Sequence, residues 1–205
     1  MNNIFGKYYP IVIDCETSGL DPDRHAILEV AYACLDLEHG RLRVGSSETF
    51  HVEPFENAQF DPKSMEIHQI DHSHPLRFAE PEAIILKNLA TFILEKAKKA
   101  GYRRAILVGH NAWFDLAFIN KAYQRHNLKS PFHQFTTCDT ATLSGFFLKE
   151  TVLAKALYKA HISYNPKEAH GALYDVEQTA KLVCYLWNKL NQLQKQANEN
   201  SLNRS

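Results

Sequence analysis

The chain has 205 residues, of which 45% are hydrophobic and 11% aromatic, a composition that favours one globular domain with a sizeable core. Lysine plus arginine and aspartate plus glutamate both number 23, so the zero formal charge excludes binding of polyanions through overall charge, and any nucleic-acid contact must be local. The N-terminus has no apolar signal core and no segment approaches the roughly 18 apolar residues of a membrane span, so we expect a cytoplasmic protein without membrane contact.

Strand patterns dominate the first quarter of the chain. The apolar run from Tyr9 to Cys15 predicts a buried strand, and a turn-rich segment from Ser18 to Arg24 follows it. Two longer strands are predicted over Ile27 to Leu37 and Leu42 to Val52. The short polar connection from Glu38 to Arg41 favours a hairpin between them.

Helical patterns alternate with one short strand in the rest of the chain. Apolar residues recur at helical spacing from Glu80 to Ala100, and a buried strand is predicted from Ala105 to Val108. A helix then follows from Trp113 to His126, and two more are expected over Thr151 to Ala160 and His170 to Leu193. This order of elements indicates an α/β fold.

The chain becomes polar after Leu193. We therefore expect a single domain over residues 1–193 and a frayed polar tail over residues 194–205. No glycine-rich phosphate loop follows any of the predicted strands, which disfavours nucleotide-cofactor chemistry.

Asp14 and Glu16 stand at the end of the first predicted strand. Side chains alternate along a strand, so the two carboxylates leave on one face while Cys15 leaves on the other. Two negative charges at so short a distance repel each other unless a cation lies between them, and hard divalent ions prefer carboxylate oxygens. The pair predicts a metal site, with the solvated end of a strand as the alternative.

Two later elements carry further candidate ligands. Asp115 lies at the start of a helix that follows a buried strand, where open α/β sheets build their sites, although an aspartate there also stabilises the helix N-terminus. His170 and Asp175 are separated by about 140° if both lie on one helix, so they converge more easily if His170 precedes the helix. Each element alone is compatible with an ordinary capping or surface residue.

Taken in this order, the elements resemble the DEDDh exonuclease family, with matching positions at Asp14, Glu16, Asp115, His170 and Asp175. The resemblance implies a ribonuclease H-like α/β fold with a central mixed five-stranded sheet flanked by helices. It also implies two Mg²⁺ ions about 4 Å apart, replaceable by Mn²⁺, one activating water and one stabilising the departing sugar oxygen. The imidazole of His170 would accept the proton of the attacking water.

Additional blocks are similar to the branch of this family that trims the 3′ ends of stable RNA. The similarity extends from Tyr9 to Asn188 and implies a homodimeric 3′-to-5′ exoribonuclease. Its expected partners are the single-stranded 3′ ends of tRNA and rRNA precursors, and its expected products are nucleoside 5′-monophosphates. The blocks are Tyr9 to Asp14, Phe50 to Phe55, Arg104 to Asn111, Pro131 to His133, Asp139 to Ala141 and Ala169 to Asp175.

Members of this branch grip terminal bases with aromatic side chains, which suit single strands because every base has a π-face. Phe114 and Phe135 stand at matching positions, with packing in the core as the alternative. Leu20 and Ile67 occupy two other substrate-binding positions of the family, and Lys63 replaces a glutamate of the base pocket. These three departures weaken any transfer of base preference.

Basic residues cluster at the end of the helix predicted to finish at Ala100. In the family, a basic patch of one subunit feeds RNA into the catalytic centre of the other. Lys98 and Arg104 match positions of this patch, and Arg103 lies between them, so we expect all three to contact the RNA backbone. A solvated helix end is the alternative.

Two other functions stay open. The segment from Met65 to Asp71 resembles proofreading subunits of DNA polymerases, which makes a 3′-to-5′ exodeoxyribonuclease acting on single-stranded DNA the first alternative. A non-catalytic RNA-binding protein on the same fold is the second, and the complete acidic set disfavours it.

Overall fold

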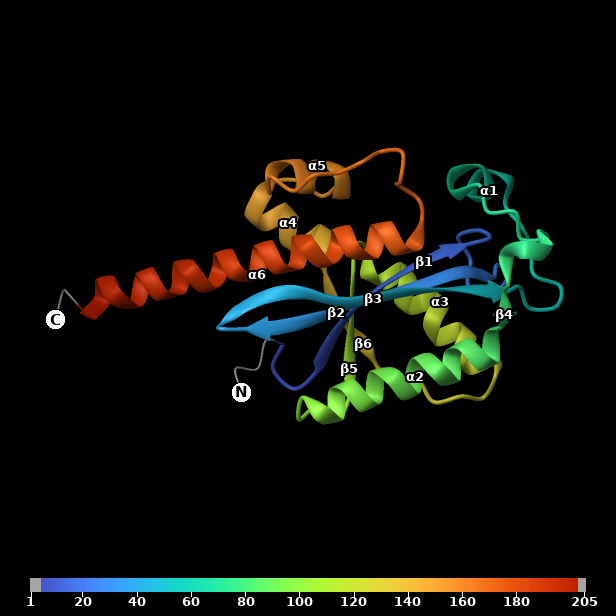
Figure 1. Cartoon of the computed structure of the whole chain (residues 1–205), viewed down its shortest axis with the longest axis horizontal. Coiled ribbons are helices and arrows are strands. Elements are labelled where there is room, and N and C mark those ends of the chain that lie inside the picture. Colours follow the sequence, from blue (N-terminus) through green and yellow to red (C-terminus); the bar gives the residue numbers. More distant parts are fainter. Residues whose placement is uncertain (1–4, 203–205) are drawn as a thin grey trace.

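The computed structural model describes residues 5–202, so the first four residues of the expected domain and the last three of the expected tail lie outside it. Within the described range, the strands form one mixed sheet in the order β4-β3-β2-β1-β5-β6 (Figure 1). The expectation of five strands is corrected to six, because two residues beside β3 form β4. The strands are β1 (Tyr9–Thr17), β2 (Ile27–Glu38), β3 (Arg41–Glu53), β4 (Glu80–Pro81), β5 (Ala105–Gly109) and β6 (Phe132–Asp139).

The first three strands form an antiparallel meander, and β5 and β6 extend it in parallel on the other side of β1. The predicted hairpin is present, with Glu38 paired to Arg41. Strand β1 is therefore central in the sheet, and its carboxyl end lies close to the carboxyl end of β5. This edge is where sites form in open α/β sheets.

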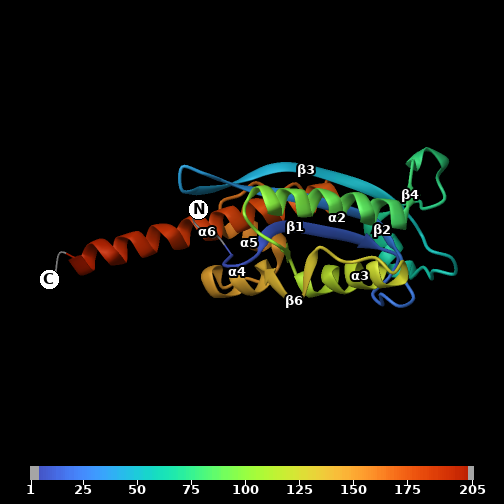
Figure 2. The same ribbon diagram turned by 90° about the horizontal axis from the view of Figure 1, so that it is seen from below.

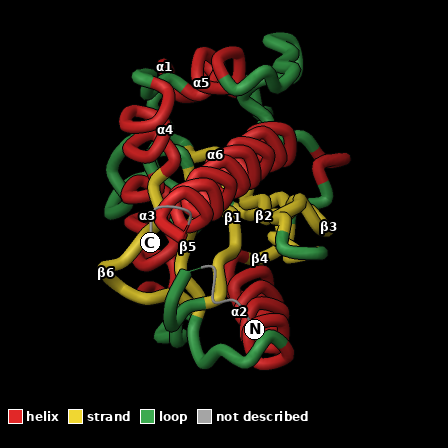
Figure 3. Tube along the Cα trace, turned by 90° about the vertical axis from the view of Figure 1, so that its left-hand side faces the viewer, coloured by secondary structure: helices red, strands yellow, loops and turns green. Residues whose placement is uncertain are grey.

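Helices cover both faces of the sheet (Figures 1 to 3). The long helix α6 contacts β1, β2 and β3 on one face, and α2 and α3 pack on the other. Short helices α4 and α5 pack beside α6. The helices are α1 (Pro62–His68), the 3₁₀ turn η1 (Pro75–Arg77), α2 (Glu82–Lys99), α3 (Ala112–Arg125), α4 (Thr140–Leu148), α5 (Leu153–Lys159) and α6 (Ala172–Leu202).

The hydrophobic core forms one cluster on each face of the sheet, because side chains alternate between the two faces along β1. Ile11 and Ile13 are fully buried in the cluster with α2 and α3, whereas Val12 is fully buried in the cluster with Val176 of α6. Since side chains alternate along a strand, Asp14 and Glu16 emerge on the α6 face just beyond the apolar contact of Val12. The packing of α6 therefore determines what the two carboxylates meet.

The end of α6 differs from the sequence-based expectation. The helix continues past Leu193 as far as Leu202 and projects beyond the sheet (Figures 1 and 2). Residues 194–202 are thus helical, because glutamine, lysine, alanine and glutamate in this stretch are good helix formers even without an apolar face. None of the helices in residues 5–202 combines the length and apolar character of a membrane span.

Candidate active site

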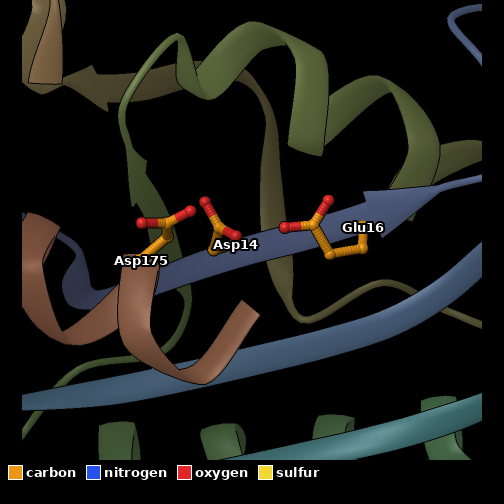
Figure 4. Close-up of side chains that lie close together, drawn as sticks. All are labelled: Asp14, Glu16 and Asp175. Atoms are coloured by element: carbon orange, nitrogen blue, oxygen red, sulfur yellow. The ribbon is translucent and has the colours of Figure 1, made fainter. Parts of the chain in front are cut away.

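Three carboxylates converge at the junction of β1 and α6 (Figure 4). Asp14 and Glu16 project from β1, and Asp175 approaches them from the first turn of α6. Each side chain offers one oxygen, and these oxygens lie within 4.8 Å of one another. The arrangement is the one that the period-two spacing of Asp14 and Glu16 required.

The fourth carboxylate, Asp115, reaches the site from the opposite face of the sheet. It is 4% exposed in the first turn of α3, and its Oδ1 accepts a 3.0 Å hydrogen bond from the backbone N–H of Cys15. Pairing of β1 with β5 ends at Val12, so the N–H of Cys15 is available to Asp115. Asp115 lines the same cavity as the other three carboxylates.

Burial raises the pKa of every carboxylate in the group, and the charges of neighbouring carboxylates raise those of Asp14 and Glu16 further. Burial first, and then the charge of Asp175, raises the pKa of Glu16 to about 8. Burial raises the pKa of Asp115 to about 7 against the lowering effect of the Cys15 hydrogen bond. The pKa of Asp14 is well above its usual value through burial and the charge of Asp115, and burial also raises that of Asp175. The four groups are difficult to ionise together without a cation.

The donor set fits divalent metal ions. Oδ1 of Asp175 is buried without a hydrogen-bond partner, so its lone pairs are free for a ligand. The ligands are carboxylate oxygens, which hard ions such as Mg²⁺ and Mn²⁺ prefer. Asp14, Glu16 and Asp175 form a compact group, and Asp115 completes the walls of the cavity.

His170 lies in the loop before α6, as its spacing from Asp175 favours. Its backbone is in the left-handed region with φ 66°, and its N–H donates a 3.0 Å hydrogen bond to Oδ2 of Asp175. The side chain is exposed. Its backbone thus fixes one carboxylate oxygen while its imidazole remains open to solvent and substrate.

Asp139 supports the site, a role that was not predicted from the sequence. Its Oδ1 accepts hydrogen bonds from the N–H groups of Asn111 (2.8 Å) and Ala112 (3.3 Å) at the start of α3. Its Oδ2 accepts from the N–H of Thr142 at 3.0 Å, so the same side chain caps α4. The signal available in the sequence was an aspartate directly before an apolar helical segment, a common N-cap pattern.

Two histidines, His110 in the lining of the cavity and His68 on α1, make structural hydrogen bonds. Nε2 of His110 donates to the carbonyl of Thr151 at 2.8 Å, and Nδ1 lies 2.9 Å from the hydroxyl of Thr140. Nε2 of His68 donates to the carbonyl of Thr17 at 3.2 Å. Burial lowers the pKa of both imidazoles, so they hold neighbouring loops as neutral groups.

The substrate-binding residues proposed from the sequence separate into two groups. Leu20 and Phe114 line the catalytic cavity of about 360 Å³. Ile67 is 57% exposed on α1 outside the lining of this cavity, and Phe135 is 88% exposed beside a different hollow of about 580 Å³. The catalytic cavity is lined by Asp14, Cys15, Glu16, Leu20, His110, Asn111, Trp113, Phe114, Asp115 and Asp175.

The basic residues lie away from the carboxylates of their own chain. Lys98 is in the last turn of α2, and Arg103 and Arg104 follow in the turn that leads into β5; all three are exposed. Arg104 lines the same hollow as Phe135. Strand β5 separates this end of the sheet from Asp115 by about 15 Å, given its five residues.

Comparison with known proteins agrees with this geometry. A family model described as Exonuclease matches residues 11–183. Ribonuclease T of Shewanella denitrificans is 44% identical over 191 residues, which cover 92% of this chain and 84% of that protein. The chain belongs to the ribonuclease T family of exonucleases. Ribonuclease T of Vibrio campbellii is another member, 45% identical over 188 residues that cover 90% of this chain and 88% of that protein.

Solved structures share the mixed α/β fold of this chain. Escherichia coli Exonuclease I in complex with a dT13 oligonucleotide has a TM-score of 0.71 and 18% identity, covering 92% of this chain and 43% of that one. The nuclease domain of 3′hExo, a DEDDh family member bound to rAMP, has a TM-score of 0.66 and 21% identity over 92% of this chain and 94% of that one.

Proposed function

We propose that this member of the ribonuclease T family is a Mg²⁺-dependent 3′-to-5′ exoribonuclease. Its natural substrates are the 3′ ends of tRNA and other stable RNAs in the cytoplasm. The observation that carries the proposal is the convergence of four carboxylates on one cavity, with an exposed histidine on the adjoining loop. A volume of about 360 Å³ is within the range of small-ligand sites and suits one nucleotide.

Each catalytic side chain has a separable task. Asp14, Glu16, Asp115 and Asp175 would hold the metal ions, which would supply activation of water and stabilisation of the departing oxygen. His170 accepts the proton of the attacking water, since its imidazole is exposed beside Asp175. Hydrolysis breaks the bond between phosphorus and the 3′ oxygen of the preceding nucleotide. The released nucleotide keeps its 5′-phosphate, and the shortened RNA ends in a 3′-hydroxyl.

Delivery of RNA by a second subunit is the arrangement we propose for substrate binding. Lys98, Arg103 and Arg104 supply positive charge for the phosphates, and Phe135 supplies an exposed ring in the same hollow as Arg104. This surface lies at the end of β5 opposite to Asp115, which favours contact with RNA that enters the other subunit of a homodimer. Sedimentation that shows only monomer at micromolar concentration would remove this part of the proposal.

The experiment that tests the function compares matched single strands of RNA and DNA with a 5′ label in Mg²⁺. We expect a ladder of RNA products shortened one nucleotide at a time from the 3′ end, release of 5′-monophosphates, and no activity in EDTA. Asp175→Asn is the inactive control. Strong preference for DNA would favour the exodeoxyribonuclease alternative, and inactivity in both Mg²⁺ and Mn²⁺ would favour a non-catalytic RNA-binding protein.

A further inference from the structure

Trp113 is an exposed aromatic side chain on the wall of the catalytic cavity. It lies in the first turn of α3, two positions before Asp115, and 66% of its surface is exposed. The indole lies 5.9 Å from the ring of Phe114 at an angle of 89°, an edge-to-face contact that covers at most one face of the indole. With 66% of its surface exposed, Trp113 thus has at least one aromatic face open to solvent.

The surroundings of Trp113 distinguish it from the other apolar residues of the cavity. Phe114 packs against the core and lies 4.9 Å from the ring of Phe118, so it is committed to the interior. Leu20 is 75% exposed but has no π-face on which a base can stack. Among the aromatic side chains of described residues that line the cavity, His110 and Phe114 are half-buried and Trp113 is exposed, so Trp113 has the most open ring surface for a ligand.

The position of Trp113 relative to the carboxylates is fixed by the start of α3. The N–H of Cys15 holds Asp115, and Asp139 accepts the N–H groups of Asn111 and Ala112 directly before Trp113. The backbone from which the indole projects is thus held at a constant distance from the carboxylates. A fixed point of attachment of this kind helps to position a substrate.

We propose that Trp113 binds a base at the 3′ end of the RNA by stacking, and that it is a substrate-binding residue of the catalytic cavity. The inference rests on the exoribonuclease function proposed above. An indole face attracts any nucleobase, and stacking of one base on an aromatic side chain corresponds to roughly a 5- to 150-fold change in affinity. Trp113 supplies at this cavity the aromatic surface that Leu20 and Ile67 lack.

The first test measures stacking through the fluorescence of Trp113. The chain has two tryptophans, so Trp187→Phe leaves Trp113 as the single indole. The probe is an RNA oligonucleotide whose last linkage is a non-hydrolysable methylenephosphonate, added in the presence of Mg²⁺. We expect its binding to quench Trp113, and a matched oligonucleotide without bases at the last two positions to quench it far less. Equal quenching of Trp113 by the two oligonucleotides would overturn the inference. So would the absence of quenching when fluorescence anisotropy shows that the oligonucleotide binds.

The second test separates binding from chemistry. Trp113→Ala should raise KM roughly 5- to 150-fold with little change in kcat, because the side chain touches no reacting atom, and Trp113→Phe should retain most of the affinity. Phe146→Ala is the matched control, since Phe146 is 83% exposed on α4 outside the lining of the cavity. Equal thermal midpoints of all variants would show that the fold is intact.

Failure of the inference and failure of the proposed function give different results. If the wild-type enzyme shortens RNA and Trp113→Ala has the same KM, the stacking role is wrong and the exoribonuclease function stands. If Trp113→Ala changes the sedimentation of the protein and not its KM, Trp113 belongs to a protein contact and the inference is likewise wrong. If the wild-type protein cleaves no RNA, both fall.

Discussion

The backbone N–H of Cys15 and Oδ1 of Asp115 are joined by a 3.0 Å hydrogen bond that ties β1 to the first turn of α3. The two residues are 100 positions apart in the chain. The bond holds Asp115 beside the strand that carries Asp14 and Glu16, so the fourth carboxylate is in place before a ligand binds. Positioning of this kind by the folded chain avoids reorganisation during the reaction.

Replacement of Asp175 by asparagine tests the metal ligands. Asp175→Asn keeps an oxygen that can accept the N–H of His170 but removes the negative charge, so we expect hydrolysis to fall more than about a hundredfold with little change in stability. The measurement is cleavage of labelled RNA together with circular dichroism. Glu95→Gln, at an exposed position of α2, is the control and should be fully active. Near-normal cleavage by Asp175→Asn would contradict the site.

The raised carboxylate pKa values predict how the stability of the metal-free protein depends on pH. Glu16 has a folded pKa of about 8 against 4.5 unfolded, and Asp115 has about 7 against 3.8. Between the unfolded and folded pKa values the folded protein binds more protons than the unfolded chain, so this contribution to stability is fully present below about pH 4 and is lost progressively as the pH rises to between 7 and 8. We expect the thermal midpoint in EDTA to fall across this range.

Divalent ions should reverse this loss, because they bind the ionised carboxylates of the folded protein. Mg²⁺ or Mn²⁺ is therefore expected to raise the thermal midpoint more at pH 8 than at pH 5. The double variant Asp14→Asn with Glu16→Gln should show a flatter pH profile and little response to metal. A midpoint in EDTA that rises from pH 5 to pH 8 in the wild type, or an equal metal response of the double variant, would count against the prediction.

The parts of the site that follow local rules could be predicted from the sequence. Alternation along β1 placed Asp14 and Glu16 on one face, and the angular spacing favoured His170 in a loop before the helix of Asp175. Strand β6 was missed because its residues are mostly exposed or half-buried, and its pairing with β5 contains a register shift. Such a strand has no continuous apolar run to reveal it.

The relative positions of side chains from distant segments could not be predicted from the sequence. Phe114 and Phe135 were both expected from the sequence to contact bases, yet Phe114 lines the catalytic cavity and Phe135 lies in another hollow. The two orphan N–H groups at the start of α3 are satisfied by Asp139, a residue at the end of a different strand. Both relationships depend on the pairing of β5 with β6 in the sheet, and no local sequence pattern predicts this pairing.

Replacement of Asp139 tests whether a residue that is not a metal ligand helps to position the active site. Asp139→Ala removes acceptors at the starts of both α3 and α4, so we expect a loss of about 2 kcal/mol of stability, roughly 1 kcal/mol for each cap. Because α3 carries Asp115, kcat should also fall, by about tenfold, with KM less affected. Asp139→Asn keeps one acceptor oxygen and should recover part of both. Urea unfolding and single-turnover cleavage measure the two effects, and unchanged kcat in Asp139→Ala would show that the contact is only structural.

A buried ion pair far from the carboxylate cluster predicts loss of stability without loss of chemistry. Glu82, whose side chain is 4% exposed at the start of α2, binds Nη1 of Arg125 through both oxygens at 2.7 and 2.9 Å and Nε2 of His126 at 2.8 Å. Arg125 also lies 3.7 Å over the ring of Phe55.

Glu82→Ala leaves the guanidinium of Arg125 partly buried without its partner, so we expect a loss of about 3 kcal/mol in the free energy of unfolding. Urea unfolding should show a lower midpoint with the same m-value. Glu95→Ala on the exposed face of α2 should change stability by less than about 0.5 kcal/mol. In native buffer kcat should stay close to wild type, since none of these side chains lines the catalytic cavity. A loss of stability below about 1 kcal/mol in Glu82→Ala would contradict this prediction. It would mean that water or a shift of the side chain compensates Arg125 for the lost carboxylate.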